Sequence, residues 1–170
     1  LGEVLVERGL GLVYGGAQVG LMGVVADAVM ESGGKVFGVI PTFLSGKEVA
    51  HPGLTELRVV ESMHERKALM AERADAFVAL PGGFGTLDEL FEIMTWAQLG
   101  LHEKPCGLLN VAGYFDGLLA FLDNAMREGF LKPEYRQLLV TADGPEELVN
   151  ALRGYRRTQG EGVLKSPDQT

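Results

Sequence analysis

Short apolar segments alternate along this chain with longer stretches in which apolar residues recur every three or four positions. The short segments have the length of buried β-strands, and the longer stretches have the periodicity of helices that bury one face. The predicted strands are 11–14, 35–40, 57–60, 76–80, 105–110 and 138–141, and the predicted helices are 21–32, 62–73, 87–99, 114–128 and 146–153. This alternation indicates an α/β fold: a Rossmann-like, doubly wound, mostly parallel sheet with helices on both faces.

The length of 170 residues suits one domain, which we place at residues 1–157. Residues 41–55 are polar and contain glycine and proline, so they predict a loop near the ligand end of the sheet. Residues 158–170 predict a disordered tail. The chain begins at Leu1 within what looks like the tail of a helix, so we expect an upstream strand and most of that helix to be missing.

The overall charge and the cysteine content exclude several classes of partner. The formal net charge of −8 argues against a broad nucleic-acid surface, because phosphate backbones are held by clustered lysine and arginine. No apolar run approaches the roughly 20 residues that cross a membrane. The single cysteine, Cys106, fits a reducing, cytoplasmic location and predicts a buried, inert thiol. His51, His64 and His102 are scattered, so no metal site is predicted.

The strongest candidate for chemistry is the segment PGGFGTLDE, which directly follows a predicted strand and precedes a helix. Its three glycines, Gly82, Gly83 and Gly85, let the backbone approach a ligand closely. The start of the helix directs N–H groups and the positive end of its dipole to the same place, and Thr86 adds a hydroxyl. The pattern predicts a phosphate site. The alternative is a tight turn without a ligand, for which two glycines would suffice.

A second glycine-rich segment, YGGAQVGLMG, also lies between a predicted strand and a helix. It does not match the dinucleotide motif G-x-G-x-x-G, because Ala17 stands where a glycine is required after Gly15. We therefore expect Gly15 and Gly16 to bring a second stretch of backbone close to a nucleotide, rather than to form an NAD site. Close packing of the helix against the strand is enough to explain Gly20 and Gly23.

The third candidate is a basic pair at the start of the helix 62–73. Ser62 and Glu65 have the spacing of a capping box, which places Arg66 and Lys67 in the first turns. A cation near a helix start opposes the helix dipole, and this mild cost indicates a function. An arginine can make two parallel hydrogen bonds to a phosphate or a carboxylate. The spacing is equally consistent with a solvated basic face that Arg66 shares with Lys67 and Arg73.

Glu89 is open to two interpretations. Thr86 and Glu89 also have capping-box spacing, so Glu89 is a candidate helix cap. A carboxylate beside a phosphate site is equally suited to hold ribose hydroxyls, orient water or stabilise an oxocarbenium-like transition state. The spacing alone does not separate a cap from a functional carboxylate.

Taken together, these segments resemble the LONELY GUY (LOG) family, the cytokinin riboside 5′-monophosphate phosphoribohydrolases, formerly labelled lysine decarboxylase-like. The resemblance spans nearly the whole chain and rests on GLMG, on MHERK and on the segment PGGFGTLDE. It implies hydrolysis of N6-substituted adenosine 5′-monophosphates to the free base and ribose 5-phosphate, for cytokinin activation or nucleotide salvage. It also implies a homodimer, and no cofactor is expected.

Carried over by position, the resemblance implies that Arg66 and Glu89 are the two catalytic residues. It implies substrate contacts at Glu48, Lys67, Gly83, Phe84, Gly85, Thr86, Leu87, Asp88 and Thr95. The chain departs from the family pattern at Phe84, where many members have tyrosine, and at Ala17, which replaces a usual glycine. Glu65 stands where other members have glutamine.

The sequence gives less support to two other functions. A pyridoxal phosphate decarboxylase is not supported, because no lysine lies in a recognisable cofactor motif. The stronger alternative is a non-catalytic carrier, because molybdenum-cofactor carriers of the same superfamily also hold a phosphate-bearing ligand on glycine turns. The joint presence of Arg66 and Glu89 in the family pattern favours the hydrolase.

Overall fold

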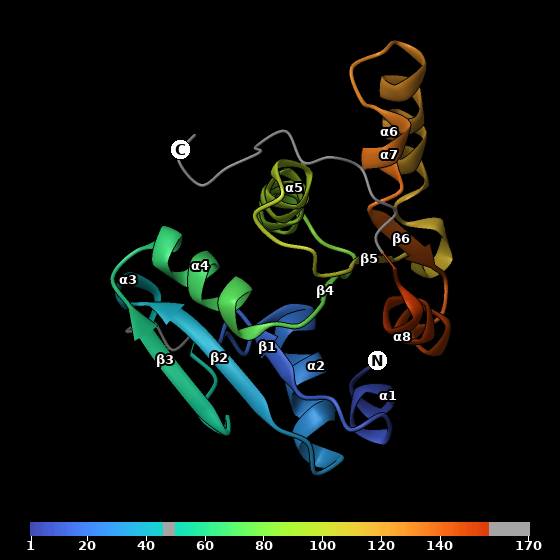
Figure 1. Cartoon of the computed structure of the whole chain (residues 1–170). Helices are drawn as coiled ribbons and strands as arrows, with labels where there is room; N and C mark the ends of the chain where they lie inside the picture. The colour runs from blue at the N-terminus through green and yellow to red at the C-terminus, as the bar shows by residue number, and fades with distance from the viewer. Residues whose placement is uncertain (46–49, 157–170) are drawn as a thin grey trace. The chain divides into compact units, whose positions relative to one another are not determined.

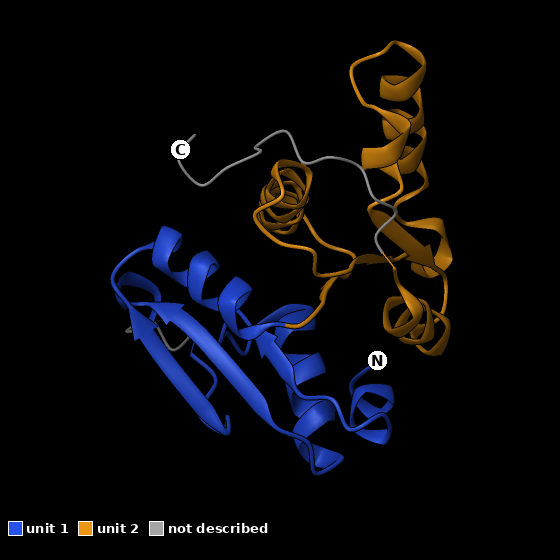
Figure 2. Ribbon diagram, in the orientation of Figure 1, with its two compact units in different colours: residues 1–74 blue, residues 75–170 orange. Residues whose placement is uncertain are grey.

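The computed structural model describes residues 1–45 and 50–156. The chain divides into two compact units, Leu1–Ala74 and Asp75–Thr170, and each is described by itself (Figures 1 and 2). The predicted tail at 158–170 lies outside the described residues, as does Glu48. That residues 1–157 act as one domain stays a prediction.

The first unit is a parallel three-stranded sheet with helices. Its strands pair in the order β1-β2-β3, with Tyr14 opposite Gly38 and Pro41 opposite Val60. The elements are α1 Gly2–Glu7, β1 Leu12–Tyr14, α2 Gly20–Glu31, β2 Val36–Pro41, α3 Thr42–Ser45, β3 Glu56–Val60 and α4 Met63–Arg73.

Helices cover both faces of this sheet. Val36 of the central strand belongs to an apolar cluster with Ala26 and Val29 of α2. The next residue, Phe37, lies under the guanidinium of Arg73 of α4, with 4.9 Å between the guanidinium carbon and the ring centroid. Successive side chains of a strand point to opposite faces. The helices α2 and α4 therefore lie on opposite sides of β2, as Figure 1 shows.

The second unit repeats this design. Its sheet is also parallel, in the order β4-β5-β6, and α8 packs on β5 and β6 through Leu148 and Leu152. The helix α5 packs through Ala97 against Tyr135 and Leu138. The elements are β4 Phe77–Ala79, α5 Phe84–Leu99, β5 Cys106–Leu109, the 3₁₀ turn η1 Val111–Gly113, α6 Asp116–Arg127, α7 Pro133–Arg136, β6 Leu139–Ala142 and α8 Pro145–Gly154.

The predicted α/β, Rossmann-like class and all six predicted strands are confirmed, each strand to within one residue at either end. Three predictions need correction. The helix α5 begins at Phe84 rather than at residue 87. Within the segment predicted as a loop at 41–55, the short helix α3 follows β2 directly. The short helix α7 and the turn η1 were not predicted, because elements of three or four residues are too short to show a period.

Candidate active site

The start of α4 is fixed by the predicted pair Ser62 and Glu65. The Ser62 hydroxyl accepts a hydrogen bond from the Glu65 backbone N–H at 3.1 Å, as a helix cap does. The Glu65 carboxylate accepts one in return from the backbone N–H of Glu61 at 2.8 Å. These two bonds determine where the helix starts, and so they determine on which side of it Arg66 lies.

Arg66 is buried, with 8% of its surface exposed. Its Nε donates a hydrogen bond to the carbonyl oxygen of Val39 in β2 at 3.1 Å. Its guanidinium occupies the place where a side chain on Gly15 would begin, directly after β1. The interpretation of Arg66 as part of a solvated basic face is therefore wrong, whereas Lys67 beside it is half-buried.

The fold itself requires both glycines after β1. Gly15 leaves room for Arg66, and Gly16 has a φ of +74°, a left-handed conformation that favours glycine. The carbonyl of Gly16 accepts a hydrogen bond from the backbone N–H of His51 at 2.9 Å.

The prediction that close packing of helix against strand explains Gly20 is wrong. It has a φ of +59° and no atom within 4 Å of where its side chain would start, among the described residues. Gly23 does lie against the backbone of Gln18.

Sequence reasoning missed the polar cluster formed by Tyr14, Asp27 and His51. The buried ring of His51 lies 2.9 Å from an Asp27 oxygen through Nε2, while its Nδ1 accepts from the backbone N–H of Gly53 at 3.2 Å. Burial, with a smaller effect from the charge of Asp27, raises the pKa of Tyr14 to about 12. The partners are far apart in the sequence, so no local pattern identifies them.

The start of α5 differs from the prediction in a way that bears on Glu89. Gly83 is the N-cap residue, and as a glycine it has no side chain with which to cap the helix. Thr86 is therefore the third residue of the helix, and Glu89 lies in its second turn, beyond the reach of a capping box. The capping interpretation of Glu89 is wrong, because Gly82 and Gly83 turn the chain from β4 into the helix without a side-chain cap.

The three glycines of this turn are not equivalent. Gly82 is required by the fold, because a side chain on it would overlap the Thr86 hydroxyl. A side chain on Gly83 or Gly85 would meet no atom within 4 Å in the described part of the chain, and neither has a positive φ. The fold therefore leaves Gly83 and Gly85 unexplained. They keep open the space at the positive end of a 16-residue helix.

One face of α5 carries several of the predicted substrate contacts. Phe84, Leu87, Asp88 and Thr95 line a shallow groove of about 460 Å³ together with Phe91, Glu92 and Trp96. Phe84 is almost fully exposed, at 94%. The Thr95 hydroxyl donates to the carbonyl of Phe91 at 2.7 Å, within its own helix. Glu89 is half-buried and does not line this groove; it follows Gly85 by one helical turn.

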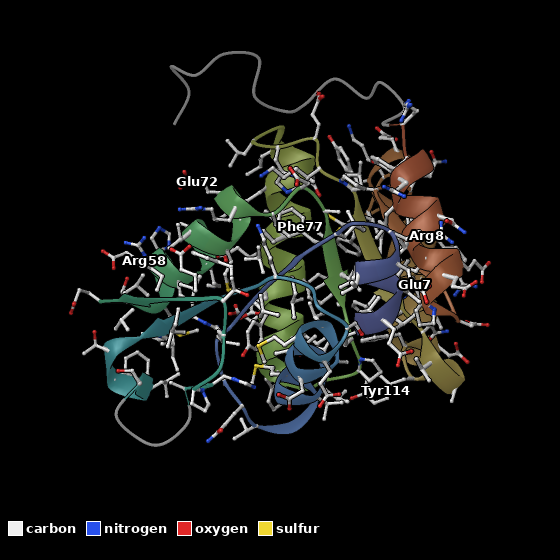
Figure 3. The ribbon with its side chains drawn as sticks, turned by 90° about the horizontal axis from the view of Figure 1, so that it is seen from below. Glu7, Arg8, Arg58, Glu72, Phe77 and Tyr114 are labelled. Atoms are coloured by element: carbon white, nitrogen blue, oxygen red, sulfur yellow. The ribbon has the colours of Figure 1, made fainter. Side chains whose placement is uncertain are left out.

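A loop after β5 reaches the same turn. The Tyr114 hydroxyl donates a hydrogen bond to the carbonyl of Gly82 at 2.9 Å (Tyr114 is labelled in Figure 3). Asn110, at the end of the buried strand β5, is 6% exposed and accepts from the backbone N–H of Phe115 at 2.7 Å. The sequence did carry a signal for this loop, since a polar asparagine ends an otherwise apolar strand.

The structure thus gathers the predicted residues into two groups. Gly15, Gly16 and Arg66 adjoin one another in the first unit, and residues 82–89 form the start of α5 in the second. Within the described ranges, no group of three or more metal-ligating side chains occurs, and no helix is long and apolar enough to cross a membrane. Cys106 is buried as predicted, and burial raises its pKa to about 12.

Comparison with known proteins agrees with these motifs. Residues 22–152 match the family model described as "Possible lysine decarboxylase". A probable cytokinin riboside 5′-monophosphate phosphoribohydrolase of Oryza sativa subsp. japonica is 59% identical over 155 residues, which cover 91% of this chain and 68% of that protein. A cytokinin riboside 5′-monophosphate phosphoribohydrolase of Arabidopsis thaliana is 51% identical over 166 residues, covering 98% and 73%.

A solved structure shares the fold at lower sequence identity. The molybdenum cofactor binding protein of Rippkaea orientalis superposes with a TM-score of 0.67 at 21% identity, over 90% of this chain and 82% of that one. This likeness concerns the fold alone. The family match and the two plant relatives together establish that the chain belongs to the LOG family, the family of the cytokinin riboside 5′-monophosphate phosphoribohydrolases.

Proposed function

We propose that this protein hydrolyses the N-glycosidic bond of adenosine 5′-monophosphates, with or without an N6 substituent, and releases the free base and ribose 5-phosphate. Its plant relatives carry the name of this activity. The observation that carries the proposal is the start of α5, where Gly83 and Gly85 leave open space at a helix N-terminus and Glu89 follows one turn later.

The 5′-phosphate binds at the start of α5. The first backbone N–H groups of a helix have no partner within the helix, and its dipole favours a negative charge there. Gly83, Phe84, Gly85 and Thr86 supply these groups, and the absence of side chains at the two glycines lets a phosphate approach the backbone. The adjoining groove residues Leu87, Asp88 and Thr95 supply further contacts to the nucleotide.

Glu89 acts on the sugar. When the bond between the anomeric carbon and the base nitrogen breaks, its electron pair leaves with the base, and positive charge develops on the ribose. The carboxylate of Glu89 stabilises this charge while a water oxygen bonds to the anomeric carbon; one proton of the water ends on the base. The phosphate bound at the helix start holds the ribose at a fixed distance from the carboxylate.

Arg66 supplies a guanidinium whose position is fixed. Its hydrogen bond to Val39 and its contact with Gly15 hold it in one orientation in the first unit. The family resemblance assigns this group to the phosphate or to the departing base. Because its side chain is already ordered, binding through it loses little conformational entropy. Lys67 and Glu48 are assigned as further substrate contacts by family resemblance alone. A homodimer belongs to the proposal on the same ground, and a cytoplasmic location belongs to it because the single cysteine fits a reducing compartment.

The test is to incubate the purified protein with adenosine 5′-monophosphate (AMP) and with isopentenyladenosine 5′-monophosphate, and to separate the products by chromatography. Release of adenine or isopentenyladenine together with ribose 5-phosphate supports the proposal and ranks the substrates. The matching nucleosides, which lack the phosphate, should not be cleaved.

The carrier is the alternative outcome. A folded protein that binds both nucleotides but releases no base would contradict the hydrolase. This result would favour a carrier, which binds a phosphate-bearing ligand without catalysing a reaction on it. Calorimetry with AMP on the same sample separates this outcome from a simple failure to bind.

A further inference from the structure

We propose that Tyr114 is a positioning residue for phosphate binding: its hydroxyl fixes the orientation of the peptide between Gly82 and Gly83 at the start of α5. This inference rests on the proposed function only in taking the start of α5 as the phosphate site. It assigns no chemical step to Tyr114. All the contacts that carry it lie within the second unit.

The Tyr114 hydroxyl acts through the geometry of the peptide bond between Gly82 and Gly83. The Tyr114 hydroxyl donates to the carbonyl oxygen of Gly82 at 2.9 Å. This peptide is trans, and in a planar trans peptide the N–H of the next residue points opposite to the carbonyl. Holding the Gly82 carbonyl toward Tyr114 therefore aims the Gly83 N–H away from Tyr114. Glycines have the widest choice of backbone angles, so an external restraint matters most at such a pair.

Tyr114 is itself held in place by its neighbours. Its ring packs edge-on against the buried ring of Phe115, with 5.0 Å between centroids and planes at 90°. Asn110 ties the loop at several points. Its side chain accepts from the Phe115 backbone N–H and donates to Asp116 at 2.9 Å, and its own backbone N–H donates to the carbonyl of Ala142 at 2.8 Å.

The same loop contains a strained residue. Ala112 has a φ of +52°, and it is the one residue other than glycine with a positive φ in the described parts of the chain. Gly113 follows with a φ of +71°, and a side chain on it would overlap the carboxylate of Asp116. Strained conformations persist where the surrounding structure enforces them, and they concentrate at functional sites. Here the strained turn brings the chain from Asn110 to Tyr114 in four residues.

The exposure of Tyr114 argues against a purely structural purpose for its hydroxyl. Tyr114 is more than half exposed, at 56%, and its ring contact with Phe115 does not need the hydroxyl. Among the residues that the structure describes, the hydroxyl makes its hydrogen bond to the Gly82 carbonyl. A bond from an exposed tyrosine to a two-glycine turn is well placed to order that turn.

The test compares Tyr114→Phe with the unchanged protein. This change keeps the ring and its contact with Phe115 and removes only the hydroxyl. We expect the KM for AMP and the dissociation constant for ribose 5-phosphate to rise about three- to tenfold, the effect of losing one hydrogen bond. We expect kcat to stay within about twofold and the affinity for adenine, which has no phosphate, to stay unchanged.

A matched control is Tyr135→Phe, which removes a hydroxyl from α7 of the same unit; it should leave all these constants unchanged. Unchanged ribose 5-phosphate affinity in Tyr114→Phe would overturn the inference, and so would an equal loss for adenine. If the unchanged protein binds ribose 5-phosphate but cleaves no nucleotide, the proposed function fails, and the calorimetric comparison still decides the role of Tyr114.

Discussion

The guanidinium of Arg66 lies where a side chain on Gly15 would begin. The two residues come from different elements, the first turns of α4 and the end of β1, and each determines what the other position can hold. Burying a charged group is unfavourable unless it is hydrogen-bonded. Arg66 is 8% exposed and donates to the Val39 carbonyl, so the fold holds a buried, hydrogen-bonded cation beside the first glycine turn.

The first prediction concerns this pair. Gly15→Ala would place a methyl group against the guanidinium and displace it. We expect kcat/KM for AMP to fall at least about tenfold, because small misplacements of a catalytic group are costly. We expect the free energy of unfolding to fall by about 1–3 kcal/mol, as for overpacking. Steady-state kinetics and urea unfolding measure the two effects.

A double-mutant cycle with Arg66→Ala provides the control for this prediction. If Gly15→Ala acts by displacing Arg66, it has little further effect on kcat/KM once the guanidinium is gone. Effects of the two changes that simply add would show that Gly15 acts on its own, and would remove the argument that this contact positions Arg66.

The second prediction tests the proposed catalytic role of Glu89. The helix α5 begins at Phe84, so Glu89 lies beyond its first turn. We expect Glu89→Ala to lower kcat by at least about a hundredfold while AMP binding stays measurable. Its effect on the free energy of unfolding should be smaller than the roughly 1 kcal/mol that loss of a cap costs. Single-turnover assays, calorimetry and urea unfolding together decide this, and full activity in the variant would refute the mechanism.

The strands were predictable from the sequence for a physical reason. Parallel strands are covered on both faces, so they read as continuous apolar runs, and Cys106–Leu109 is buried at every position. The start of α5 was less predictable. Glycine is a poor helix former, so the sequence predicts that the helix begins after Gly85. In the structure Gly85 already lies within the helix.

The composition of the site was predictable only in part. The segment 81–89 follows a strand and precedes a helix, so its place in the fold could be read locally. The burial of Arg66 could not, because Gly15 and Val39 lie far from it in the sequence. The same holds for Tyr114, whose partner Gly82 is 32 positions away. Local patterns identify the residue types at a site, whereas long-range contacts decide how those residues are held.

The third prediction concerns stability at high pH. Burial raises the pKa of Cys106 from its ordinary value of 9.0 to about 12. Burial, and to a lesser extent Asp27, raises the pKa of Tyr14 from 10.0 to about 12. The folded protein therefore holds both protons more tightly than the unfolded chain does. Their contribution to stability is complete below pH 9, and it is lost as the pH rises from 9 toward 12.

Urea unfolding at intervals between pH 8 and pH 11 tests this dependence. The free energy of unfolding should decline less steeply from pH 9 upward in Cys106→Ala, and less steeply from pH 10 upward in Tyr14→Phe. The Tyr14 hydroxyl is buried without a hydrogen-bond partner among the described residues, so Tyr14→Phe should cost little stability at pH 7. If the free energy of unfolding of a variant declined with pH as steeply as that of the unchanged protein, the replaced group would not titrate as its burial implies.

The last prediction sets stability against function at Gly85. This residue lies in the first turn of α5, has no positive φ, and has no described atom within 4 Å of where a side chain would begin. Gly85→Ala should therefore raise the free energy of unfolding by about 0.5–1 kcal/mol. The added methyl group would stand at the proposed phosphate site, so we expect AMP to bind roughly tenfold more weakly. The control is Gly117→Ala in α6, which is open in the same way and should stabilise the protein without changing AMP affinity. If Gly85→Ala stabilised the protein and bound AMP as tightly as before, the phosphate would have to lie elsewhere.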